Sequence, residues 1–374
     1  MRRLVVLEAR GTPGFLDGLR AAWDAGDAVF PLDPRIPATA RERALAAARP
    51  DAPVEDGDAL VVATSGTTGD PKCVVLTHDA VRASALAASA RLGVDPARDR
   101  WLACLPLAHV GGLSVVTRAL ATGTPLVVHD GFSAPAVEAA ATDPDSPVTL
   151  VSLVATALRR VDPGLFRRVV LGGSAMPPDL PPNAVATYGM TETGSGVVYD
   201  GVPLDGVEVR TVDGAGGPVT APGGEGAIEL RGPMLLRAYR DGTDPRRRDG
   251  WLPTGDAGAW DFAAGRLRVF GRTGDLVITG GENVWPVAVE RVLGAHPAVA
   301  EVAVVGRPDP EWGQRVVAVV VPSDPTSPPS LDVLRDAVKA ELPAYAAPRE
   351  LILAEALPRT ALGKVARAAL TALR

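Results

Sequence analysis

The chain has 374 residues, of which 47% are hydrophobic, and it carries a formal net charge of −6 at pH 7. A chain of this length can bury a large core and divide into several domains. The acidic balance excludes a nucleic-acid backbone as the main partner, because binding one needs a basic face. We therefore expect small-molecule substrates and no nucleic acid.

Membrane segments and metal-ligand patterns are both lacking in the sequence. No apolar stretch approaches the roughly 20 residues that span a bilayer, and the opening residues 1–8 become charged too early for a signal peptide. Cys73 and Cys104 are too few for a disulfide framework, and the four histidines show no ligand spacing. These features predict a cytoplasmic protein without membrane insertion and without a tightly held zinc.

Short apolar runs alternate with alanine-rich amphipathic segments from about residue 59 to about residue 190. This alternation is typical of repeated βα units, so it predicts a mostly parallel sheet flanked by helices. The expected strands are 59–63, 101–105, 125–129, 148–152 and 168–171, and the expected helices are 77–92, 111–121 and 135–141.

The pattern changes twice further along the chain. Short alternating runs with frequent glycine and proline predict a β-rich, barrel-like subdomain at about residues 200–270. The last hundred or so residues read as α+β and can fold as a separate domain. Their expected helices are 285–293 and 331–342, and their expected strands are 300–305, 316–321 and one near 351. We predict an α/β protein with a large N-terminal domain, residues 1–271, and a small α+β C-terminal domain, residues 272–374.

A loop rich in hydroxyl groups and glycine follows the first predicted strand. Its candidate phosphate ligands are Thr64, Ser65, Gly66, Thr67, Thr68, Gly69 and Lys72. The glycines let the backbone approach an anion closely, and the hydroxyl, backbone N–H and ammonium groups can donate to phosphate oxygens. The spacing differs from the Walker pattern of P-loop kinases and GTPases. The loop therefore predicts nucleotide triphosphate binding of another kind, with an ordinary polar turn as the alternative.

Lysine is rare in this chain. Only Lys72, Lys339 and Lys364 occur among the 38 basic residues. A compact ammonium can serve a narrow phosphate or carboxylate site as a point charge, which a guanidinium cannot. Lys72 and Lys364 lie in glycine-containing loops, so they are candidates for binding anionic groups.

Further segments carry groups that suit the other parts of a nucleotide. The predicted strand that runs into Gly172 and Gly173 would let a flat ring lie against the backbone. The segment 188–194 offers an aromatic ring, hydroxyl groups and the Glu192 carboxylate, and a carboxylate near phosphates usually holds Mg²⁺. Asp256, expected after a tight turn, can accept both ribose hydroxyls. Each segment alone is also typical of solvated surface.

Together and in this order, these segments resemble the adenylate-forming superfamily of acyl-CoA synthetases, luciferases and peptide-synthetase adenylation domains. The resemblance runs from about residue 59 to the C-terminus, and it includes the closing Pro-Arg-Thr-x-x-Gly-Lys of residues 358–364. It implies that a carboxylate attacks the α-phosphate of ATP to give an acyl-adenylate and pyrophosphate. A thiol then displaces AMP. The implied cofactors and co-substrates are ATP, Mg²⁺ and coenzyme A.

The resemblance also implies a role for each matching residue. Lys364 would bridge the attacking carboxylate and the α-phosphate, Thr191 would contact that phosphate, and Glu192 would hold Mg²⁺. The implied catalytic residues are Lys364, Thr191, Glu192 and His109. The implied ATP- and AMP-binding residues are Thr64, Ser65, Gly66, Thr67, Thr68, Gly69, Lys72, Gly173, Ser174, Ala175, Tyr188, Gly189, Asp256 and Arg272.

The small domain of this superfamily rotates between the two half-reactions. By resemblance, rotation would remove Lys364 and bring Gly280 and Gly281 in to line a tunnel for the pantetheine arm of coenzyme A. The pivot, in a hinge near residues 272–275, matches Gly274, where many relatives carry a charged residue. With glycine at this position the chemical role of the hinge residue is left undetermined, but a flexible hinge is still expected.

The acid substrate is indicated by fewer residues. The segment 105–113 resembles the family segment that leads into the acyl pocket, with His109 at its opening and Gly112 and Gly189 beside the substrate. Arg118 interrupts an apolar helix nine residues later, which is two and a half turns, so the two side chains need not share a face. Arg118 either extends to water or pairs with a second carboxylate on the substrate.

Ligases of o-succinylbenzoate, in the menaquinone pathway, carry a basic residue at this offset and a stretch very similar to residues 280–286. Their substrate has an aromatic and a succinyl carboxylate, so one can react while Arg118 binds the other. The short segment before the phosphate loop resembles abbreviated ligases of this type from actinobacteria. The resemblance thus implies an o-succinylbenzoate:CoA ligase, with a homodimer left open.

Two alternatives remain. The first is a ligase for another aryl or short-chain acid that feeds coenzyme A or a carrier protein. The second is a nucleotide-binding regulatory protein without catalysis, although all the motif residues including Lys364 are present.

Overall fold

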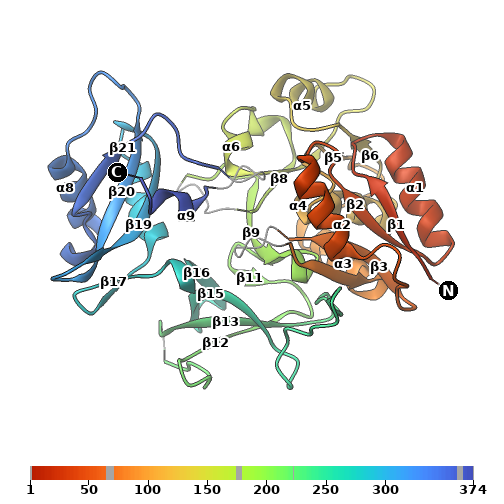
Figure 1. The fold of residues 1–374 in the computed structure, drawn as a ribbon. Helices are drawn as coiled ribbons and strands as arrows, with labels where there is room; N and C mark the ends of the chain where they lie inside the picture. The colour runs from red at the N-terminus through yellow and green to blue at the C-terminus, as the bar shows by residue number, and fades with distance from the viewer. Residues whose placement is uncertain (1, 65–70, 174–178, 222, 360–364, 374) are drawn as a thin grey trace. The chain divides into compact units, whose positions relative to one another are not determined.

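The computed structural model describes residues 2–64, 71–173, 179–221, 223–359 and 365–373 (Figure 1). These residues group into two compact units. The first comprises Met1–Val209, Glu229–Pro253 and Phe262–Leu267, and the second comprises Arg210–Ile228, Thr254–Asp261 and Arg268–Arg374. The boundary expected from the sequence, between residues 271 and 272, stays a prediction.

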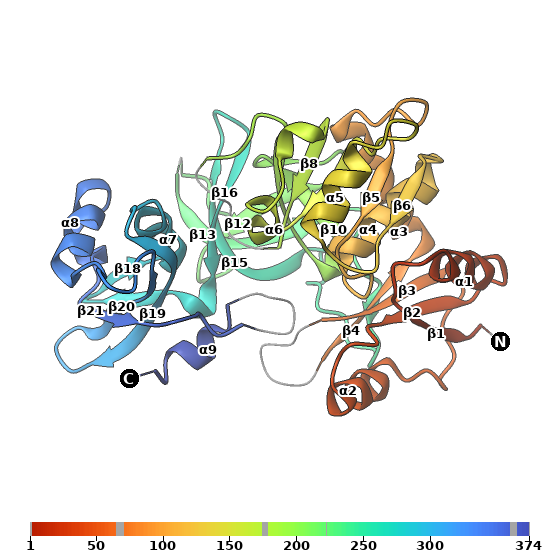
Figure 2. The ribbon, with the colours of Figure 1, turned by 90° about the horizontal axis from the view of Figure 1, so that it is seen from above.

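The first sheet contains the strands on both sides of the predicted phosphate loop (Figures 1 and 2). Its order is β1 (Leu4–Glu8), β2 (Ala28–Leu32), β3 (Asp58–Ala63), β4 (Cys73–Thr77) and β14 (Ala238–Tyr239). The helices α1 (Pro13–Asp24) and α2 (Ala38–Ala48) connect β1, β2 and β3, which are parallel, whereas β4 is antiparallel to β3 and β14. β4 is absent from the predicted elements, because its short apolar run reads as the approach to a helix. The phosphate loop therefore joins two antiparallel strands and does not lead into a helix.

The second sheet confirms the predicted parallel sheet. Its order is β11 (Val202–Pro203), β10 (Ser195–Tyr199), β9 (Ala184–Met190), β8 (Arg168–Leu171), β7 (Leu150–Leu153), β5 (Trp101–Ala103) and β6 (Leu126–Val128). All pairs from β9 to β6 are parallel, and only β10 and β11 run antiparallel. Residues 188–190 end strand β9, so the segment 188–194 is not one short loop as the sequence suggested.

Two helices separate these sheets and position the predicted acyl segment. Helix α3 (His78–Leu92) packs against α4 (Val110–Thr122), against β3 and β4 of the first sheet, and against β10 of the second. Thr77 caps α3 by accepting a hydrogen bond from the Ala80 N–H at 3.1 Å, and Gly93 ends the helix with φ of +60°. Small buried residues on α3, such as Ala85 and Ala88, allow the close approach of α4. The helices predicted at 77–92 and 111–121 are confirmed.

Shorter helical elements complete the first unit. Helix α5 (Ala134–Ala141) confirms the prediction at 135–141, and it precedes α6 (Ala155–Leu158) and the 3₁₀ turn η1 (Pro163–Leu165). A second 3₁₀ turn, η2 (Thr191–Thr193), connects β9 to β10. Glu192 therefore lies between two paired strands.

The segment predicted to be β-rich forms a sheet with the order β12 (Glu208–Val212), β13 (Glu225–Arg231), β15 (Leu252–Asp261) and β16 (Arg266–Arg272). Its strands contribute residues to both units. Asp256 lies within β15, next to Gly255 with φ of +74°, and not after a tight turn as expected. The chain continues through the 3₁₀ turn η3 (Thr273–Asp275).

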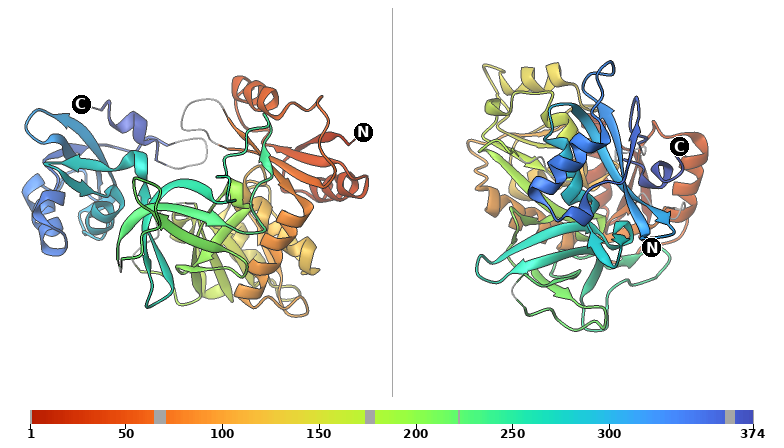
Figure 3. Two further views of the ribbon diagram at one scale, coloured as in Figure 1. Left: turned by 90° about the horizontal axis from the view of Figure 1, so that it is seen from below. Right: turned by 90° about the vertical axis from the view of Figure 1, so that its left-hand side faces the viewer.

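The C-terminal part of the second unit has its own sheet and core (Figure 3). The sheet order is β18 (Glu282–Val284), β17 (Val277–Thr279), β20 (Gly313–Pro322) and β19 (Val299–Asp309), with β21 (Glu350–Leu353) parallel to β20. Helices α7 (Pro286–Gly294) and α8 (Leu331–Glu341) pack together, and η4 (Ala344–Ala346) and α9 (Arg367–Leu370) follow. The buried core includes Val289, Leu293, Val316, Leu334 and Val338. These elements confirm the predicted α+β pattern.

The lengths and hydropathies of the helices show whether any of them could span a membrane. Among the described residues, no helix is both long and apolar enough to cross a bilayer.

Candidate active site

The predicted phosphate loop is closed at its base. Ala63 pairs with Cys73 across β3 and β4, and the Thr64 N–H donates to the Lys72 carbonyl at 2.7 Å. The Thr64 hydroxyl donates to the same carbonyl at 3.2 Å. Thr64 therefore holds the two ends of the loop together, and its hydroxyl could donate to a phosphate only by exchanging this bond. Ser65, Gly66, Thr67, Thr68 and Gly69 lie outside the described residues.

Glu192 and Lys72 are linked by a residue that the sequence did not indicate. The Tyr239 hydroxyl donates to Glu192 Oε1 at 2.9 Å, and Lys72 Nζ lies 4.9 Å from the centre of the Tyr239 ring. Burial, followed by the charge and hydrogen bond of Glu192, raises the pKa of Tyr239 well above its usual value. Tyr239 belongs to none of the recognised motifs, and it lies 47 residues from Glu192 along the chain.

The residues predicted to bind adenine lie near the ends of two neighbouring parallel strands, β8 and β9. β8 and β9 pair from Val169 with Ala184 to Leu171 with Ala186, so Gly173 and Tyr188 both lie toward the carboxyl ends of their strands. Gly173 has φ of +86°, which favours glycine. A Cβ on Gly189 would lie 2.1 Å from the Ser195 carbonyl oxygen, so only glycine fits there. Ser174 and Ala175 lie outside the described residues.

Asp256, the predicted ribose ligand, and Arg272, predicted to bind the ribose or a phosphate, contact each other within the second unit. Arg272 Nε lies 3.0 Å from Asp256 Oδ1, and Arg272 Nη1 donates to the Thr254 carbonyl at 3.0 Å. The Asp256 N–H donates to the Thr254 hydroxyl at 3.1 Å. These bonds hold the buried Asp256 in β15, with its carboxylate oriented by a cation.

Gly280 and Gly281 form the tight turn between β17 and β18. Their φ values are +60° and +83°, as a two-residue hairpin turn of the primed type requires. The Gly280 N–H donates to the Trp312 carbonyl at 2.9 Å, and a Cβ on Gly280 would lie 2.8 Å from the Trp312 ring. Trp312 therefore fixes this turn, and no sequence motif pointed to it.

Helix α4 places His109 and Arg118 in different surroundings. His109 is the half-buried N-cap residue of α4, whereas Arg118 is 2% exposed in the helix interior. Arg118 Nη2 donates to the hydroxyls of Ser195 and Tyr199, each at 3.2 Å. Its Nε and Nη1 have no hydrogen-bond partner among the described residues. The interpretation that Arg118 extends to water is therefore wrong, because its guanidinium is enclosed.

The remaining predicted residue of this segment is Gly112. A Cβ there would lie 2.4 Å from the Leu105 carbonyl oxygen. Glycine at this position therefore allows the chain before α4 to lie directly against the first turn of the helix.

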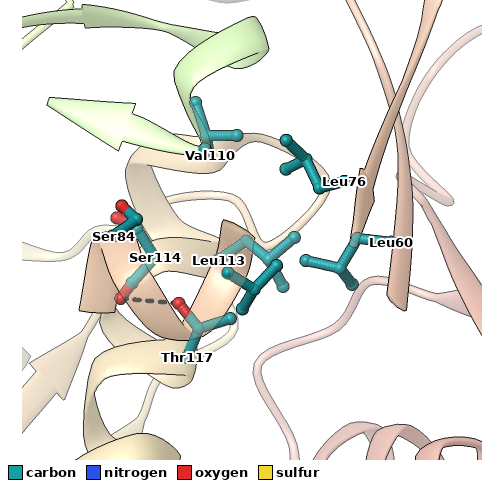
Figure 4. A pocket seen from close by; sticks show the side chains of 9 residues that line it. Leu60, Leu76, Ser84, Val110, Leu113, Ser114 and Thr117 are labelled. Atoms are coloured by element: carbon teal, nitrogen blue, oxygen red, sulfur yellow. Dashed lines mark hydrogen bonds between the residues drawn. The ribbon is translucent and has the colours of Figure 1, made fainter. Parts of the chain in front are cut away.

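A cavity of about 10 Å³ is lined by residues of α3, α4 and the strands β3 and β4 (Figure 4). Ser84, Ser114 and Thr117 supply its polar groups, and leucine and valine side chains supply the rest. The Ser84 hydroxyl lies 3.1 Å from that of Ser195, which connects the cavity to the guanidinium. This volume has room for about one water molecule, so side chains here would have to move to admit an acyl group.

Lys364 lies outside the described residues, but the helix α9 that follows it is described. Three residues later, Arg367 lies 2.8 Å from Glu290 and 3.3 Å from Asp275, and it donates to the Val304 carbonyl at 2.7 Å. These contacts are all within the second unit, and Asp275 is adjacent to the predicted pivot, Gly274.

Lys72, which ends a segment rich in glycine and hydroxyl groups, contacts the ring of Tyr239, and the Tyr239 hydroxyl binds the buried Glu192. A cation and a carboxylate brought together in this way suit an enzyme class that binds nucleotide phosphates. The chain belongs to the AMP-binding enzyme family: residues 46–240 match this family, and residues 288–364 match its C-terminal domain. This finding confirms the resemblance inferred from the sequence motifs.

Similar proteins carry a consistent set of names. A probable 2-succinylbenzoate–CoA ligase of Mycobacterium tuberculosis is 39% identical over 99% of this chain and 97% of its own length. The o-succinylbenzoate CoA synthetase of Bacillus subtilis, solved with its acyl-adenylate intermediate, is 28% identical with a TM-score of 0.86, covering 100% of this chain and 89% of that one. It has also been solved with ATP and a magnesium ion. An amide bond synthetase of Marinactinospora thermotolerans is 28% identical with a TM-score of 0.85, covering 99% and 89%.

Proposed function

We propose that this chain is an ATP-dependent ligase that activates o-succinylbenzoate as an acyl-adenylate and transfers the acyl group to coenzyme A, a step of menaquinone biosynthesis. The names of its relatives from Mycobacterium and Bacillus support this assignment. The observation that carries it is Arg118, a buried guanidinium with two nitrogen atoms that have no partner among the described residues. A buried cation is costly unless an anion joins it, and a dicarboxylic substrate supplies one.

Two carboxylates on one substrate have different tasks in this proposal. One carboxylate attacks the α-phosphate, while the other binds Arg118, which Ser195 and Tyr199 orient. A charge-assisted pair in this dry interior would be stronger than one in water. Binding at a distance from the reacting carboxylate also holds the acid in one orientation for attack.

The phosphate side of the reaction uses the first unit. Lys72 and the loop 64–72 bind the β- and γ-phosphates, which leave as pyrophosphate, and Thr191 contacts the α-phosphate. Glu192 is 8% exposed, and one of its oxygens is occupied by Tyr239, so the other suits a single carboxylate ligand of Mg²⁺. Bound there, Mg²⁺ would neutralise developing charge on the phosphates.

The nucleoside and the second half-reaction use other residues. Gly173, Ser174 and Tyr188 hold the adenine, with Ala175 and Gly189 beside them in the nucleotide site. Asp256 holds the ribose, and Arg272 binds the ribose or a phosphate. Lys364 serves adenylate formation, and Gly280 and Gly281 line the path of the pantetheine thiol. Support for this path comes from the Gly280 turn, where Trp312 leaves no room for a side chain.

An acid panel tests the substrate. The purified enzyme is supplied with ATP, coenzyme A and either o-succinylbenzoate or benzoates without the succinyl group, and product thioester is measured. We expect strong preference for o-succinylbenzoate, and Arg118→Ala should lower kcat/KM for it by roughly tenfold to a thousandfold with little change for ATP. Equal use of the simple benzoates would contradict the role of Arg118.

Isolated half-reactions test the role of Lys364. Lys364→Ala should abolish adenylate formation, measured by carboxylate-dependent pyrophosphate exchange, yet leave thioester formation from supplied acyl-adenylate largely intact. Equal loss in both steps would refute this role. A wild-type protein without any exchange would support the alternative of a nucleotide-binding protein without catalysis.

The acyl acceptor has a second candidate. The structural similarity to an amide bond synthetase at a TM-score of 0.85 shows that this fold also occurs in a protein named for amide formation. Supplying amines in place of coenzyme A discriminates the two acceptors, and we expect thioester to be the dominant product.

The proposal includes a cytoplasmic location, where ATP and coenzyme A are supplied, and it leaves a homodimer open. Light scattering on the purified chain would measure the oligomeric state directly.

A further inference from the structure

Tyr239 connects two parts of the phosphate site that no local motif relates. Its hydroxyl donates to Glu192 Oε1 at 2.9 Å, and its ring lies under Lys72 Nζ at 4.9 Å from the ring centre. The ammonium therefore lies within the range of a cation–π contact. A single side chain thus contacts both the proposed Mg²⁺ ligand and the lysine of the phosphate loop.

The backbone around Tyr239 is bonded to the same two segments. The Leu236 N–H donates to the Glu192 carbonyl at 2.7 Å, and the Arg240 N–H donates to the Cys73 carbonyl at 2.7 Å. Between them, β14 pairs with β4, with Tyr239 opposite Val74. The strand β14 therefore holds Glu192 and the end of the phosphate loop in a fixed relation.

Arg240 makes the position of this strand rigid. Its guanidinium donates to the carbonyls of Ala48, Arg49, Ala52 and Pro53, at 2.6–3.1 Å, just after helix α2. Because β14 is anchored on both sides, the Tyr239 hydroxyl is directed at Glu192 before any ligand binds.

We propose that Tyr239 is a positioning residue for the magnesium–triphosphate group: its hydroxyl orients the Glu192 carboxylate toward the metal, and its ring positions the Lys72 ammonium toward the phosphates. This inference rests on the proposed use of Mg²⁺ and ATP, and it does not depend on which acid is activated. Removing a group that hydrogen-bonds and orients a ligand carboxylate typically weakens metal affinity by roughly tenfold or more.

Affinities for metal and for nucleotide, measured without a carboxylic acid substrate, distinguish the contact of the Tyr239 hydroxyl with Glu192 from the contact of its ring with Lys72. Mn²⁺ replaces Mg²⁺ so that free and bound metal can be followed by electron paramagnetic resonance, in the presence of a saturating non-hydrolysable ATP analogue. Tyr239→Phe keeps the ring and should raise the Kd for Mn²⁺ about tenfold. It should leave the metal-free affinity for the analogue within about twofold of wild type, whereas Tyr239→Leu should weaken that affinity a further two- to fivefold or so.

A matched control and a double variant make the test specific. Tyr345→Phe removes a hydroxyl from an exposed tyrosine of the second unit and should leave both affinities unchanged. In a Glu192→Gln background, Tyr239→Phe should add no further loss of Mn²⁺ affinity, because the group it orients is gone. Urea unfolding of each variant checks that the fold is kept.

The outcomes distinguish this inference from the proposed function. Wild-type Mn²⁺ affinity in Tyr239→Phe, or a full additional loss in the Glu192→Gln background, would refute the positioning role of Tyr239. A wild-type protein that binds no metal–nucleotide complex would instead refute the proposed function itself.

Discussion

Arg118 illustrates how a single residue can be unfavourable for the fold and favourable for the site. The side chain is 2% exposed, and it has two hydroxyl contacts, the Trp101 ring at 5.7 Å and no ion pair among the described residues. Neutral hydroxyls compensate a buried charge only in part. Natural proteins commonly keep such groups where binding needs them.

Arg118→Met should therefore separate stability from activity. Methionine has a similar length and no charge, so we expect the free energy of unfolding to stay the same or rise by about 1 kcal/mol. The kcat/KM for the acid should fall by at least about tenfold, because the carboxylate partner is lost. Urea unfolding and steady-state kinetics measure the two effects. Arg98→Met, at a side chain 83% exposed, is the control and should change neither. A large loss of stability in Arg118→Met would identify Arg118 as a structural group instead.

The sequence identified the residues of continuous motifs but not the residues that orient them. Glu192, Lys72, Asp256 and Gly280 each lie in a short recognisable segment. Tyr239 and Trp312 act through contacts that form only when distant strands pair, as β14 does with β4. Their identity therefore depended on the tertiary structure.

At the scale of elements, α9 anchors the chain just after Lys364. The Arg367 guanidinium contacts Glu290 in α7, Asp275 in η3 and the Val304 carbonyl in β19, and the Glu290 side chain is only 13% exposed. Burial lowers the pKa of Arg367, but the hydrogen bonds and charge of Glu290 outweigh it and the pKa is raised overall. These contacts fix the position of the chain three residues after Lys364 within the second unit.

Arg367→Met should slow adenylate formation more than thioester formation. The loop that carries Lys364 loses its anchor, and Lys364 is proposed to serve only the first half-reaction, so we expect a loss of about tenfold in that step. Pyrophosphate exchange and thioester formation from supplied acyl-adenylate measure the two steps. Arg291→Met breaks an exposed pair with Glu341 in the same unit and serves as the control. Similar losses in both steps would mean that Arg367 acts on the fold as a whole.

A second element-scale anchor is sensitive to pH. Asp99, with a side chain 3% exposed, joins the segment before β5 to Arg167 before β8. Burial raises its pKa, but hydrogen bonds from the Arg167 side chain, the Asp95 N–H and the Thr149 hydroxyl outweigh burial, so the pKa lies below the usual 3.8. The stabilisation is therefore complete above pH 3.8 and is lost as the pH falls through the lower, folded-state pKa.

Asp99→Asn should lower the free energy of unfolding by about 1–3 kcal/mol at pH 7, because Arg167 loses its carboxylate. The difference in the free energy of unfolding between Asp99→Asn and wild type should stay constant from pH 7 down to about pH 4 and become smaller only below pH 4. Urea unfolding at several pH values measures it. Asp17→Asn, at a side chain 76% exposed, should have little effect. A difference that closes between pH 7 and pH 5 would contradict this assignment.

Helices with a clear periodic pattern were predictable from the sequence, whereas the strands β4 and β14 were not. The helices α3, α4, α5, α7 and α8 agree with the expected ranges within about two residues, because each has a clear apolar face or cap. The apolar run of β4 reads as the approach to a helix, and β14 has only two residues; β4 runs antiparallel to β3, and β14 runs antiparallel to β4. The antiparallel geometry around the phosphate loop was therefore not readable from the sequence.

At the scale of the whole molecule, the proposed rotation between half-reactions depends on Gly274. This glycine lies in η3, it does not have a positive φ, and a Cβ on it would meet no heavy atom within 4 Å. A side chain is therefore compatible with the conformation described here. Any effect of a substitution would arise from another conformation that the chain must reach.

Gly274→Val tests this requirement, because a β-branched residue restricts the backbone without clashing in the present state. We expect adenylate formation to stay within about twofold of wild type, and thioester formation to slow by about tenfold if the pivot must change its φ and ψ. The rate of thioester formation in Gly274→Ala should lie between those of wild type and Gly274→Val. Its free energy of unfolding should equal that of wild type or exceed it by about 0.4–1 kcal/mol, because alanine reduces the conformational freedom of the unfolded chain. Gly214, also without a positive φ and with open space around its Cα, provides the control as Gly214→Val. Half-reaction rates that fall together in Gly274→Val, or fall equally in Gly214→Val, would show that residue 274 is not the pivot.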